Sequence, residues 1–549
     1  MLKMEIKDLK KYYGDRCILD IESIKIYEND KIGLVGQNGA GKTTFLKILK
    51  KEIFLDSGFI KKYDDIASID QLECDMNQLE LSDKKEQKNF QSPNKYSKHL
   101  SGGEKTRLKI VKAFGQKAGI LIADEPSSNL DIKGVETLIS KFKQYKGALI
   151  VVSHDRHLLD VVCTKIFELE NGHIKSYDGN YSDYIVQKEK EKKTKLAEYK
   201  SYEKEKRKLQ EAIHEVEYHS STVKKTPTRM GNSEARLNKM GNQRAKKNLD
   251  QKAKAIKKRL ELLEIKEKPV EIETIKLDLK SHESIHSKII LSCQNLNYSF
   301  EDKVLFKNAG FQVLKKSKVA IIGENGSGKT TLLKLIDQEF KEIKKSKVLK
   351  IGYFRQDLSI LDNEKTILEN MRESSDMSET MIRILLARLL FKSEEVYKKV
   401  SMLSGGERVK ASFAKLILMD VNLLILDEPT NYLDLDSIRA LELVLKEYKG
   451  SLIFVSHDRT FVENVATELL IIENKKIKSY NGNYKDYLDQ EKNKNRKQNN
   501  EKELMKIEHK ITTILSRICM PKLSDDVEAL DLEYKELLKL KKEIKNNVK

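Results

Sequence analysis

Four segments of this 549-residue sequence occur twice in the same order, and this duplication constrains the fold more than any other feature. The paired segments are 32–49 with 319–336, 100–110 with 403–413, 121–131 with 424–434, and 149–156 with 452–459. In each copy apolar strand patterns lead into helices, as in α/β domains. The chain is also too long for one hydrophobic core. We therefore predict one α/β domain that is duplicated in tandem.

The stretch between the copies, from about residue 187 to 268, contains one proline and two glycines. Side chains recur there at spacings of three and four, which predicts two helices packed along one seam. An outgoing helix of about 30 residues spans roughly 45 Å, so the predicted tip, about 218–244, stands away from both domains. The seam residues are Tyr199, Tyr202, Lys206, Leu209, Ile213 and Val216 on the outgoing helix, and Leu249, Ala253, Ile256, Leu260 and Leu263 on the return.

The net charge of +19 is concentrated near this tip. Residues 218–260 hold thirteen Lys or Arg against two acids, whereas residues 188–217 interleave the two signs. A lysine-rich surface can serve solubility alone, but charge of one sign crowded into one segment favours a polyanionic partner. The chain from about residue 491 is predicted to form a mixed-charge helical extension.

Targeting and metal signals are absent from the sequence. It has no run of about 18 apolar residues and no apolar signal core near its start, so we expect a cytoplasmic protein without a membrane domain. Its cysteines form no CxxC pair and have no matching histidine cluster. We expect all five to be free thiols, which excludes zinc and iron–sulfur ATPases. They are Cys17, Cys74, Cys163, Cys293 and Cys519.

Two glycine-rich segments match GxxxxGK[ST], each between an apolar strand and a helix. Glycines let backbone amides wrap phosphates at a helix N-terminus, the lysine bridges the outer phosphates, and the threonine hydroxyl ligates Mg²⁺. We therefore predict ATP and Mg²⁺ as cofactors, with Lys42 and Lys329 on the phosphates and Thr43 and Thr330 on the metal. The predicted nucleotide-binding residues are Gly36, Gln37, Asn38, Gly39, Ala40, Gly41, Lys42, Thr43 and Thr44, and Gly323, Glu324, Asn325, Gly326, Ser327, Gly328, Lys329, Thr330 and Thr331.

An Asp-Glu pair ends a buried strand in each copy, and a histidine follows the next strand. Adjacent acids at a strand end face different directions. The Asp can therefore hold Mg²⁺ through water while the Glu reaches the attacking water as general base. A lone histidine is more often structural, but its repetition favours a contact with the terminal phosphate. These residues are Asp124, Glu125 and His154, and Asp427, Glu428 and His457.

Leu-Ser-Gly-Gly-Glu at 100–104 and 403–407 resembles the signature of ATP-binding cassette proteins. In that family two cassettes dock head to tail, so the resemblance implies that each ATP lies between one phosphate loop and the opposite signature. Residues 129–131 and 432–434 resemble the loops that connect the two sites. The implied set is Ser404, Gly405 and Gly406 over the nucleotide on Lys42; Ser101, Gly102 and Gly103 over that on Lys329; Gln71 and Gln356 beside Mg²⁺; and Tyr13 and Phe300 on adenine.

Paired cassettes on one chain with a charged hairpin between them resemble the ABC-F family, whose members act on the ribosome. The resemblance implies two ATP-binding cassettes at 1–186 and 271–490, an interdomain hairpin at 187–270 and a helical extension at 491–549. It also implies an ATPase that pairs its cassettes within a monomer and is associated with the ribosome. The implied partners are 23S rRNA and P-site tRNA, without a membrane domain or DNA.

Gln71 and Ser101 are only 30 residues apart, against 48 between Gln356 and Ser404. The helical arm that housekeeping relatives usually carry in this part of the first cassette is therefore missing or vestigial. This resembles the antibiotic-resistance branch, nearest the Vga type. Its hairpin enters by the tRNA exit site and protects the peptidyl-transferase centre from lincosamides, pleuromutilins and group A streptogramins. The implied ribosome-contacting tip is Lys224, Lys225, Arg229, Met230, Arg236, Leu237, Lys239, Met240 and Arg244.

Three points stay open at this stage. The apolar tip residues Met230, Leu237 and Met240 either reach furthest into the partner or only pack the turn of the hairpin. A housekeeping ABC-F translation factor that confers no resistance is one alternative function. The ATPase subunit of a membrane transporter is another, although it has no evident use for a basic hairpin.

Overall fold

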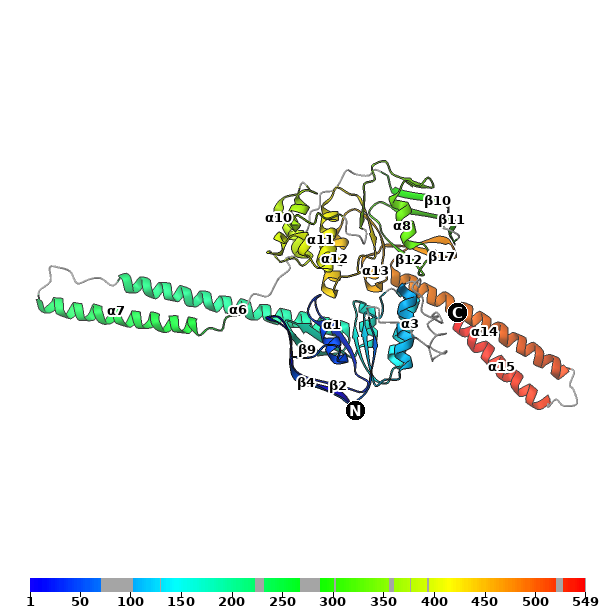
Figure 1. Ribbon diagram of the computed structural model, residues 1–549, viewed down its shortest axis with the longest axis horizontal. Helices are drawn as coiled ribbons and strands as arrows, with labels where there is room; N and C mark the ends of the chain where they lie inside the picture. Colours follow the sequence, from blue (N-terminus) through cyan, green and yellow to red (C-terminus); the bar gives the residue numbers. More distant parts are fainter. Residues whose placement is uncertain are drawn as a thin grey trace.

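The computed structural model describes most of the chain (Figure 1). The described residues are 1–70, 102–128, 130–222, 232–266, 287–300, 303–354, 360–375, 377–392, 394–519 and 527–548. Side chains within them are described except at 232–243, 245, 494–502, 519, 527–530 and 543–548. No helix in these ranges is long and apolar enough to span a bilayer. Cys17, Cys163 and Cys293 are free thiols, as expected.

Each half of the molecule is built on a six-stranded sheet with five parallel strands and one antiparallel edge strand. The strand orders are β5-β6-β7-β3-β8-β9 and β14-β15-β16-β12-β17-β18. Central strands such as β6 and β15 are buried at every residue, as expected for a sheet covered on both faces. The strands are β3 (Lys31–Val35), β5 (Ile66–Ile69), β6 (Ile120–Asp124), β7 (Ala148–Val152), β8 (Lys165–Glu170) and β9 (His173–Asp178), with β12 (Lys318–Gly323), β14 (Ile351–Phe354), β15 (Leu423–Asp427), β16 (Ser451–Val455), β17 (Glu468–Glu473) and β18 (Lys476–Asn481).

A three-stranded antiparallel sheet accompanies each large sheet, in the orders β2-β1-β4 and β11-β10-β13. Its strands precede or follow the phosphate loop in sequence, and its long hairpin carries the residue predicted to meet adenine. Tyr13 ends β1, and Phe300 ends β10. The strands are β1 (Leu2–Tyr13), β2 (Arg16–Tyr27), β4 (Ser57–Lys62), β10 (Ile289–Phe300), β11 (Lys303–Leu314) and β13 (Ile343–Lys345).

Helices cover both large sheets and place the sequence motifs at their N-termini. The N-terminal half has α1 (Lys42–Lys50), α3 (Gly102–Gly115), α4 (Ile132–Gln144) and α5 (Arg156–Val162). The C-terminal half has α8 (Lys329–Asp337), α9 (Ile367–Arg372), α10 (Glu379–Arg388), α11 (Gly405–Leu418), α12 (Leu435–Glu447) and α13 (Arg459–Val465), with 3-10 turns at Glu395–Tyr397 and Val400–Met402.

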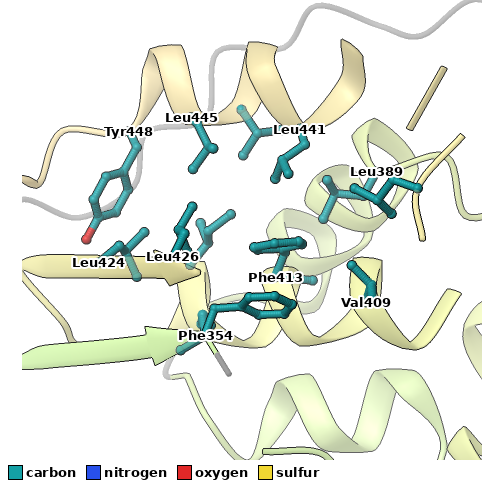
Figure 2. Packing of buried hydrophobic residues seen from close by; sticks show 14 of the residues in the cluster. Phe354, Leu389, Val409, Phe413, Leu424, Leu426, Leu441, Leu445 and Tyr448 are labelled. Carbon is teal, nitrogen blue, oxygen red and sulfur yellow. The ribbon is translucent and has the colours of Figure 1, made fainter. Parts of the chain in front are cut away.

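The largest apolar cluster holds the C-terminal half together. Figure 2 shows Phe413 of α11 against Phe354 of β14, with Leu441 and Leu445 of α12 above them. The two phenyl rings stack with centroids 4.2 Å apart. This packing fixes α11, and with it the signature at its N-terminus, against the edge of the sheet.

Two long helical hairpins leave the cassettes in opposite directions (Figure 1). One consists of α6 (Tyr181–Thr222) and α7 (Asn232–Glu261), the other of α14 (Tyr484–Cys519) and α15 (Val527–Val548). The expected tip at 218–244 is narrower than predicted, because both flanks continue as helix up to Thr222 and from Asn232. Helix formers such as Lys, Arg and Leu outweigh the cost of about 1 kcal/mol for the glycine inside α7.

The predicted seam of the first hairpin is present. Ile213 and Ala253 are buried in it, and the other seam residues are half-buried, apart from Lys206, which is exposed. Ion pairs flank the seam, with 2.7 Å between Lys257 Nζ and Glu217 and 3.2 Å between Arg259 and Glu205. The hairpin is therefore held by the apolar spacing that predicted it.

Candidate active site

Each phosphate loop joins a buried strand to a helix whose first backbone amides are free to bind an anion. The N-caps of α1 and α8 are Gly41 and Gly328, and neither helix has a side-chain cap hydrogen bond. Both caps are left-handed, with φ of 104° and 102°, and a Cβ on either would lie 2.9 Å from a neighbouring carbon atom. Only glycine fits there. Unsatisfied amides at a helix N-terminus suit a phosphate.

The lysine of each loop is held above that helix end by carbonyl groups of its own loop. Lys42 Nζ donates to the carbonyl oxygens of Gly36 at 2.6 Å and Gln37 at 2.9 Å. Lys329 Nζ donates to those of Gly323 and Glu324 at 2.8 and 3.1 Å. Burial lowers the pKa of both ammonium groups. A polyphosphate is the counter-charge that such desolvated ammonium groups favour.

The paired acids end β6 and β15 as predicted, and the glutamate of each pair has a left-handed backbone. The φ angles are 50° for Glu125 and 49° for Glu428. This conformation costs roughly 1–3 kcal/mol for a non-glycine residue and is concentrated at functional sites. Its recurrence in both copies indicates that the turn aims each glutamate at a fixed place.

A histidine lies directly against each of these glutamates. Glu125 Oε1 is 3.3 Å from His154 Nε2, and Glu428 Oε1 is 3.3 Å from His457 Nε2. The backbone N–H of each histidine donates to the other carboxylate oxygen, at 3.3 and 3.2 Å. Within the described part of the chain, both Oε1 atoms are buried and have no aligned hydrogen-bond donor. Both glutamates and both histidines line one crevice.

Burial sets the protonation of these groups. It raises the pKa of Glu125 to about 8 and that of Glu428 to about 7. It lowers the pKa of His154 and His457 to about 4, so both imidazoles are neutral at pH 7. A general base acts best when its pKa lies near the working pH. Both glutamates meet this condition.

Four of the residues predicted to hold Mg²⁺ are described, and Thr43, Asp124, Thr330 and Asp427 lie at or beside the phosphate loops. Thr330 Oγ1 donates to Asp427 Oδ1 at 3.3 Å, which joins a hydroxyl and a carboxylate at one place. Burial raises the pKa of Asp427 and of its counterpart Asp124. No cluster of three metal-binding acids, histidines or cysteines occurs among the described residues. One or two protein ligands are enough for Mg²⁺, because this ion takes most of its oxygen ligands from phosphates and water.

The two halves meet head to tail around one crevice. Asn38 of the first phosphate loop donates through Nδ2 to Tyr432 O at 2.9 Å and through its backbone to Asp434 Oδ2 at 3.1 Å. A Cβ on signature residue Gly406 would lie 3.1 Å from Asn38 Nδ2. The first phosphate loop therefore lies opposite the signature of the other half, as the resemblance implied. We call the loop 36–43 with the signature 404–406 site 1, and the loop 323–330 with the signature 101–103 site 2.

The crevice has a volume of about 1190 Å³, above the roughly 300–1,000 Å³ of a pocket for one small ligand. Residues from both sites line it, although only Asn325 and Gly326 of the second phosphate loop do so. Of the predicted residues, its lining includes Tyr13, Asn38, Gly39, Gly41, Lys42, Thr43, Thr44, Gly102, Gly103, Asp124, Glu125, His154, Asn325, Gly326, Ser404, Gly405, Gly406, Glu428 and His457.

Some predicted residues are not in this lining, among them Lys329, Thr330 and Asp427 of site 2. Phe300 is 56% exposed and does not line the crevice. Gln71, Ser101 and Gln356 lie outside the described residues, as do the tip residues Lys224, Lys225, Arg229 and Met230. Arg236, Leu237, Lys239 and Met240 belong to α7, but their side chains are outside the described part. Arg244 is exposed on α7.

Sequence reasoning missed the charged contacts that join the two halves. Arg156 of α5 is buried and binds Glu442 of α12, and its Nη2 lies 3.2 Å from Asp458. Its counterpart Arg459 pairs instead with the half-exposed Glu136 at 2.9 Å. A sequence signal for these contacts exists, because Ser-His-Asp-Arg occurs in both copies and its arginine has no part in the predicted nucleotide sites.

Comparison with known proteins agrees with this geometry. Two ABC transporter family models match the chain, one at residues 19–71, 64–128 and 306–431 and the other at 167–279. A solved structure of the archaeal ribosome recycling factor aABCE1 has a TM-score of 0.58, with 19% identity over 86% of this chain and 89% of that one. This likeness concerns the fold alone. Fold and site define an ATP-binding cassette ATPase with two cassettes in one chain.

Two curated relatives give the family. The ribosome protection protein VmlR of Bacillus subtilis is 33% identical over 84% of this chain and 85% of its own. ABC transporter F family member 5 of Arabidopsis thaliana is 30% identical over 88% of this chain and 77% of its own. The chain belongs to the ABC-F family.

Proposed function

We propose that this ATPase binds ribosomes through its interdomain hairpin and protects them from antibiotics that act at the peptidyl-transferase centre. The observation that carries the proposal is the basic outer face of α7, on a chain similar over most of its length to a ribosome protection protein. Lys252, Lys254 and Lys258 are exposed there and form no ion pair with a described residue. Ribosomal RNA supplies the phosphates that such a face binds.

The split of charge on α7 supports this interpretation. Lys257 and Arg259 turn towards α6, where Glu217 and Glu205 pair with them, so they fasten the hairpin. The neighbouring Lys252, Lys254 and Lys258 point to solvent. The hairpin therefore uses part of its charge for its own seam and keeps the remainder for a partner.

The ATP cycle follows from the two composite sites. Lys42 or Lys329 and the helix N-terminus beside it bind the phosphates, and the opposite signature closes over them. Glu125 or Glu428 accepts a proton from the attacking water, while the neutral histidine beside it fixes the carboxylate. Closure requires ATP because its phosphates join the two halves, and hydrolysis removes that link.

Magnesium is part of this proposal. Asp427 and Thr330 in site 2, and Asp124 and Thr43 in site 1, would hold the ion together with phosphate oxygens. When bound, Mg²⁺ would neutralise charge that develops on the phosphates. Gln71 and Gln356 stay predicted ligands.

The finer features of the function rest on resemblance. We propose entry of the hairpin by the tRNA exit site beside P-site tRNA and 23S rRNA, and a drug range of lincosamides, pleuromutilins and group A streptogramins, as in the Vga type. The tip residues, with Met230, Leu237 and Met240 foremost, are the proposed effectors. Cassettes at 1–186 and 271–490 and helical parts at 187–270 and 491–549 are the proposed divisions, although α6 and α14 already begin at Tyr181 and Tyr484.

Drug susceptibility tests this proposal. Cells that express the chain should tolerate a lincosamide or a pleuromutilin better than cells without it. Replacing residues 223–231 with Gly and Ser at equal length should abolish the protection, because α6 and α7 are untouched while the segment between them loses its side chains. Co-sedimentation with ribosomes is the control that the variant still binds. Full protection by this variant would rule out Met230 and the rest of 223–231 as effectors and leave Leu237 and Met240 of α7 as the remaining candidates.

A housekeeping ABC-F translation factor is the second candidate. The match to ABC transporter F family member 5, whose name mentions no resistance, extends over as much of this chain as the match to VmlR. In this case, expression should leave drug susceptibility unchanged while ribosome binding and ATP hydrolysis persist.

A further inference from the structure

The root of the interdomain hairpin is packed between the two cassettes. The first turn of α6 carries Tyr181 and Tyr184, both at most 5% exposed. These rings lie in a small apolar cluster with Val35, which ends the strand before the phosphate loop of site 1, and with Leu435, the first residue of α12 in the other half. A movement of α12 must therefore change the surroundings of the hairpin root.

Polar contacts fix the same joint. Glu168 of β8 is buried and accepts a hydrogen bond from Tyr184 Oη at 2.7 Å, and Lys188 of α6 pairs with it. From the other half, the guanidinium of Arg439 lies 5.6 Å from the centre of the Tyr181 ring. A cation over an aromatic face stabilises this geometry. The hairpin root is thus tied to both halves at once.

The end of α12 that contacts the hairpin root also contacts ATP site 1. Asp434 caps α12 by accepting from Ser437 N at 2.9 Å, and its other oxygen accepts from Asn38 N of the first phosphate loop at 3.1 Å. Leu435 follows directly and enters the root cluster. One helix end therefore links the phosphate loop of site 1 to the base of α6.

Site 2 has a matching joint with the other hairpin. Ile132, which begins α4, packs against the cluster that holds Tyr484 at the root of α14. The next residue, Lys133, reaches Glu324 of the second phosphate loop at 2.6 Å. The two roots share the sequence Gly-Asn-Tyr-x-Asp-Tyr, at 179–184 and 482–487. The duplication therefore extends beyond the cassettes into the first turn of each hairpin.

We propose that each ATP site controls one hairpin: site 1 sets the interdomain hairpin through Leu435 and Arg439, and site 2 sets the C-terminal hairpin through Ile132. Leu435 and Arg439 are positioning residues, since they touch neither nucleotide nor catalytic groups. By reciprocity, a partner held by α6 and α7 and ATP bound at site 1 raise each other's affinity. We expect this coupling to stimulate hydrolysis at site 1 and to leave site 2 unchanged. This inference rests on the proposed function only in taking the ribosome as that partner.

Single-site variants separate the two sites. Glu428→Gln leaves site 1 as the hydrolysing site, and Glu125→Gln leaves site 2. Adding Leu435→Ala with Arg439→Gln should lower the stimulation by purified bacterial 70S ribosomes about fivefold or more in the first background, the lower end of usual coupling. The same two substitutions should leave ribosome stimulation in the Glu125→Gln background unchanged. A general loss of stability would instead lower the stimulation in both backgrounds.

The matched control uses the equivalent positions of the other half. Ile132→Ala with Glu136→Gln should leave stimulation of site 1 intact, because Ile132 packs against the cluster that holds the root of α14 and Glu136 pairs with Arg459 of α13. Equal effects of the two variant pairs, or an equal loss in both single-site backgrounds, would overturn the proposal.

A second measurement needs no ribosome. If ribosomes fail to stimulate the unmodified chain, that failure refutes only the proposed function, and this measurement still tests the link between ATP site and hairpin. Fluorophores on non-natural amino acids at the exposed positions 25 on β2 and 258 on α7 report the angle of the hairpin to its cassette. In a Glu125→Gln, Glu428→Gln chain, ATP should shift the energy transfer. Lys42→Ala should abolish that shift and Lys329→Ala should retain most of it, whereas equal losses would overturn the assignment.

Discussion

The two helical hairpins start alike and end differently. Both begin at a tyrosine that directly follows the edge strand of a cassette, and both roots pack against the opposite half. Their return helices differ in charge: α7 has ten Lys or Arg against three acids, whereas α15 has five against five. Figure 1 shows that they point away from each other. The two hairpins are thus equivalent at their roots. Their distal surfaces differ in charge, and this difference decides which kind of partner each can bind.

A second difference lies at the interface of the halves. Arg156 is 6% exposed and is held by Glu442 and Asp458, but the equivalent Arg459 pairs with an acid that is 58% exposed. Equivalent sequence positions therefore carry unequal electrostatic energy. The two halves are tied together more firmly at one arginine than at the other.

The largest expected effect concerns the feature that the halves share. Replacing both catalytic carboxylates, Glu125→Gln with Glu428→Gln, should lower ATP hydrolysis by about 10²–10⁴-fold, the usual contribution of a general base. ATP binding should persist, because Lys42 and Lys329 remain, and the closed chain should accumulate on ribosomes. Phosphate release and co-sedimentation measure the two outcomes. Glu136→Gln, an acid away from the crevice, serves as the control, and retained hydrolysis in the double variant would exclude these bases.

The next largest expected effect is a difference in stability between variants at the partners of Arg156 and of Arg459. Glu442→Ala leaves the Arg156 charge buried with Asp458 alone, so we expect a loss of stability near the lower end of the roughly 3–5 kcal/mol for a broken buried pair. Glu136→Ala removes an exposed partner of Arg459 and should cost about 0–1 kcal/mol. Urea unfolding measures both. Equal midpoints for the two variants would show that burial does not distinguish these pairs.

The sequence could predict the parts of the site that are local in the chain. The phosphate loop, the strand-end acids and the following histidine each have the local spacing of their own strand–turn–helix unit, so Lys42, Glu125 and His154 could each be predicted without tertiary information. The hairpin seam was equally readable from its spacing, apart from Lys206, which is exposed because its long side chain reaches solvent. Contacts such as Arg156 with Glu442 join residues 286 apart and have no local signature.

The C-terminal hairpin shows another limit of pattern reading. A mixed-charge helical extension was predicted, but the chain forms two antiparallel helices with Ile507, Ile511 and Ile514 buried between them. Their spacing of four and three was a usable signal. Polar residues before it, rich in Asn and Lys, masked that signal because they carry no apolar face.

The smallest expected effect separates the two hairpins by charge. If α7 meets RNA phosphates, ribosome binding should weaken with salt, and each lost contact should flatten the slope of log affinity against log salt by up to about 0.7–0.9. Lys252→Gln, Lys254→Gln and Lys258→Gln together should therefore reduce the slope. The same change at Lys535, Lys539 and Lys542, exposed on the neutral α15, is the matched control and should leave it unaltered. Lys257 is left in place because it fastens the seam to Glu217 at 2.7 Å. Ribosome co-sedimentation over a salt series gives both slopes, and equal slopes for the two triple variants would mean that the charge of α7 serves solubility and not a polyanionic partner.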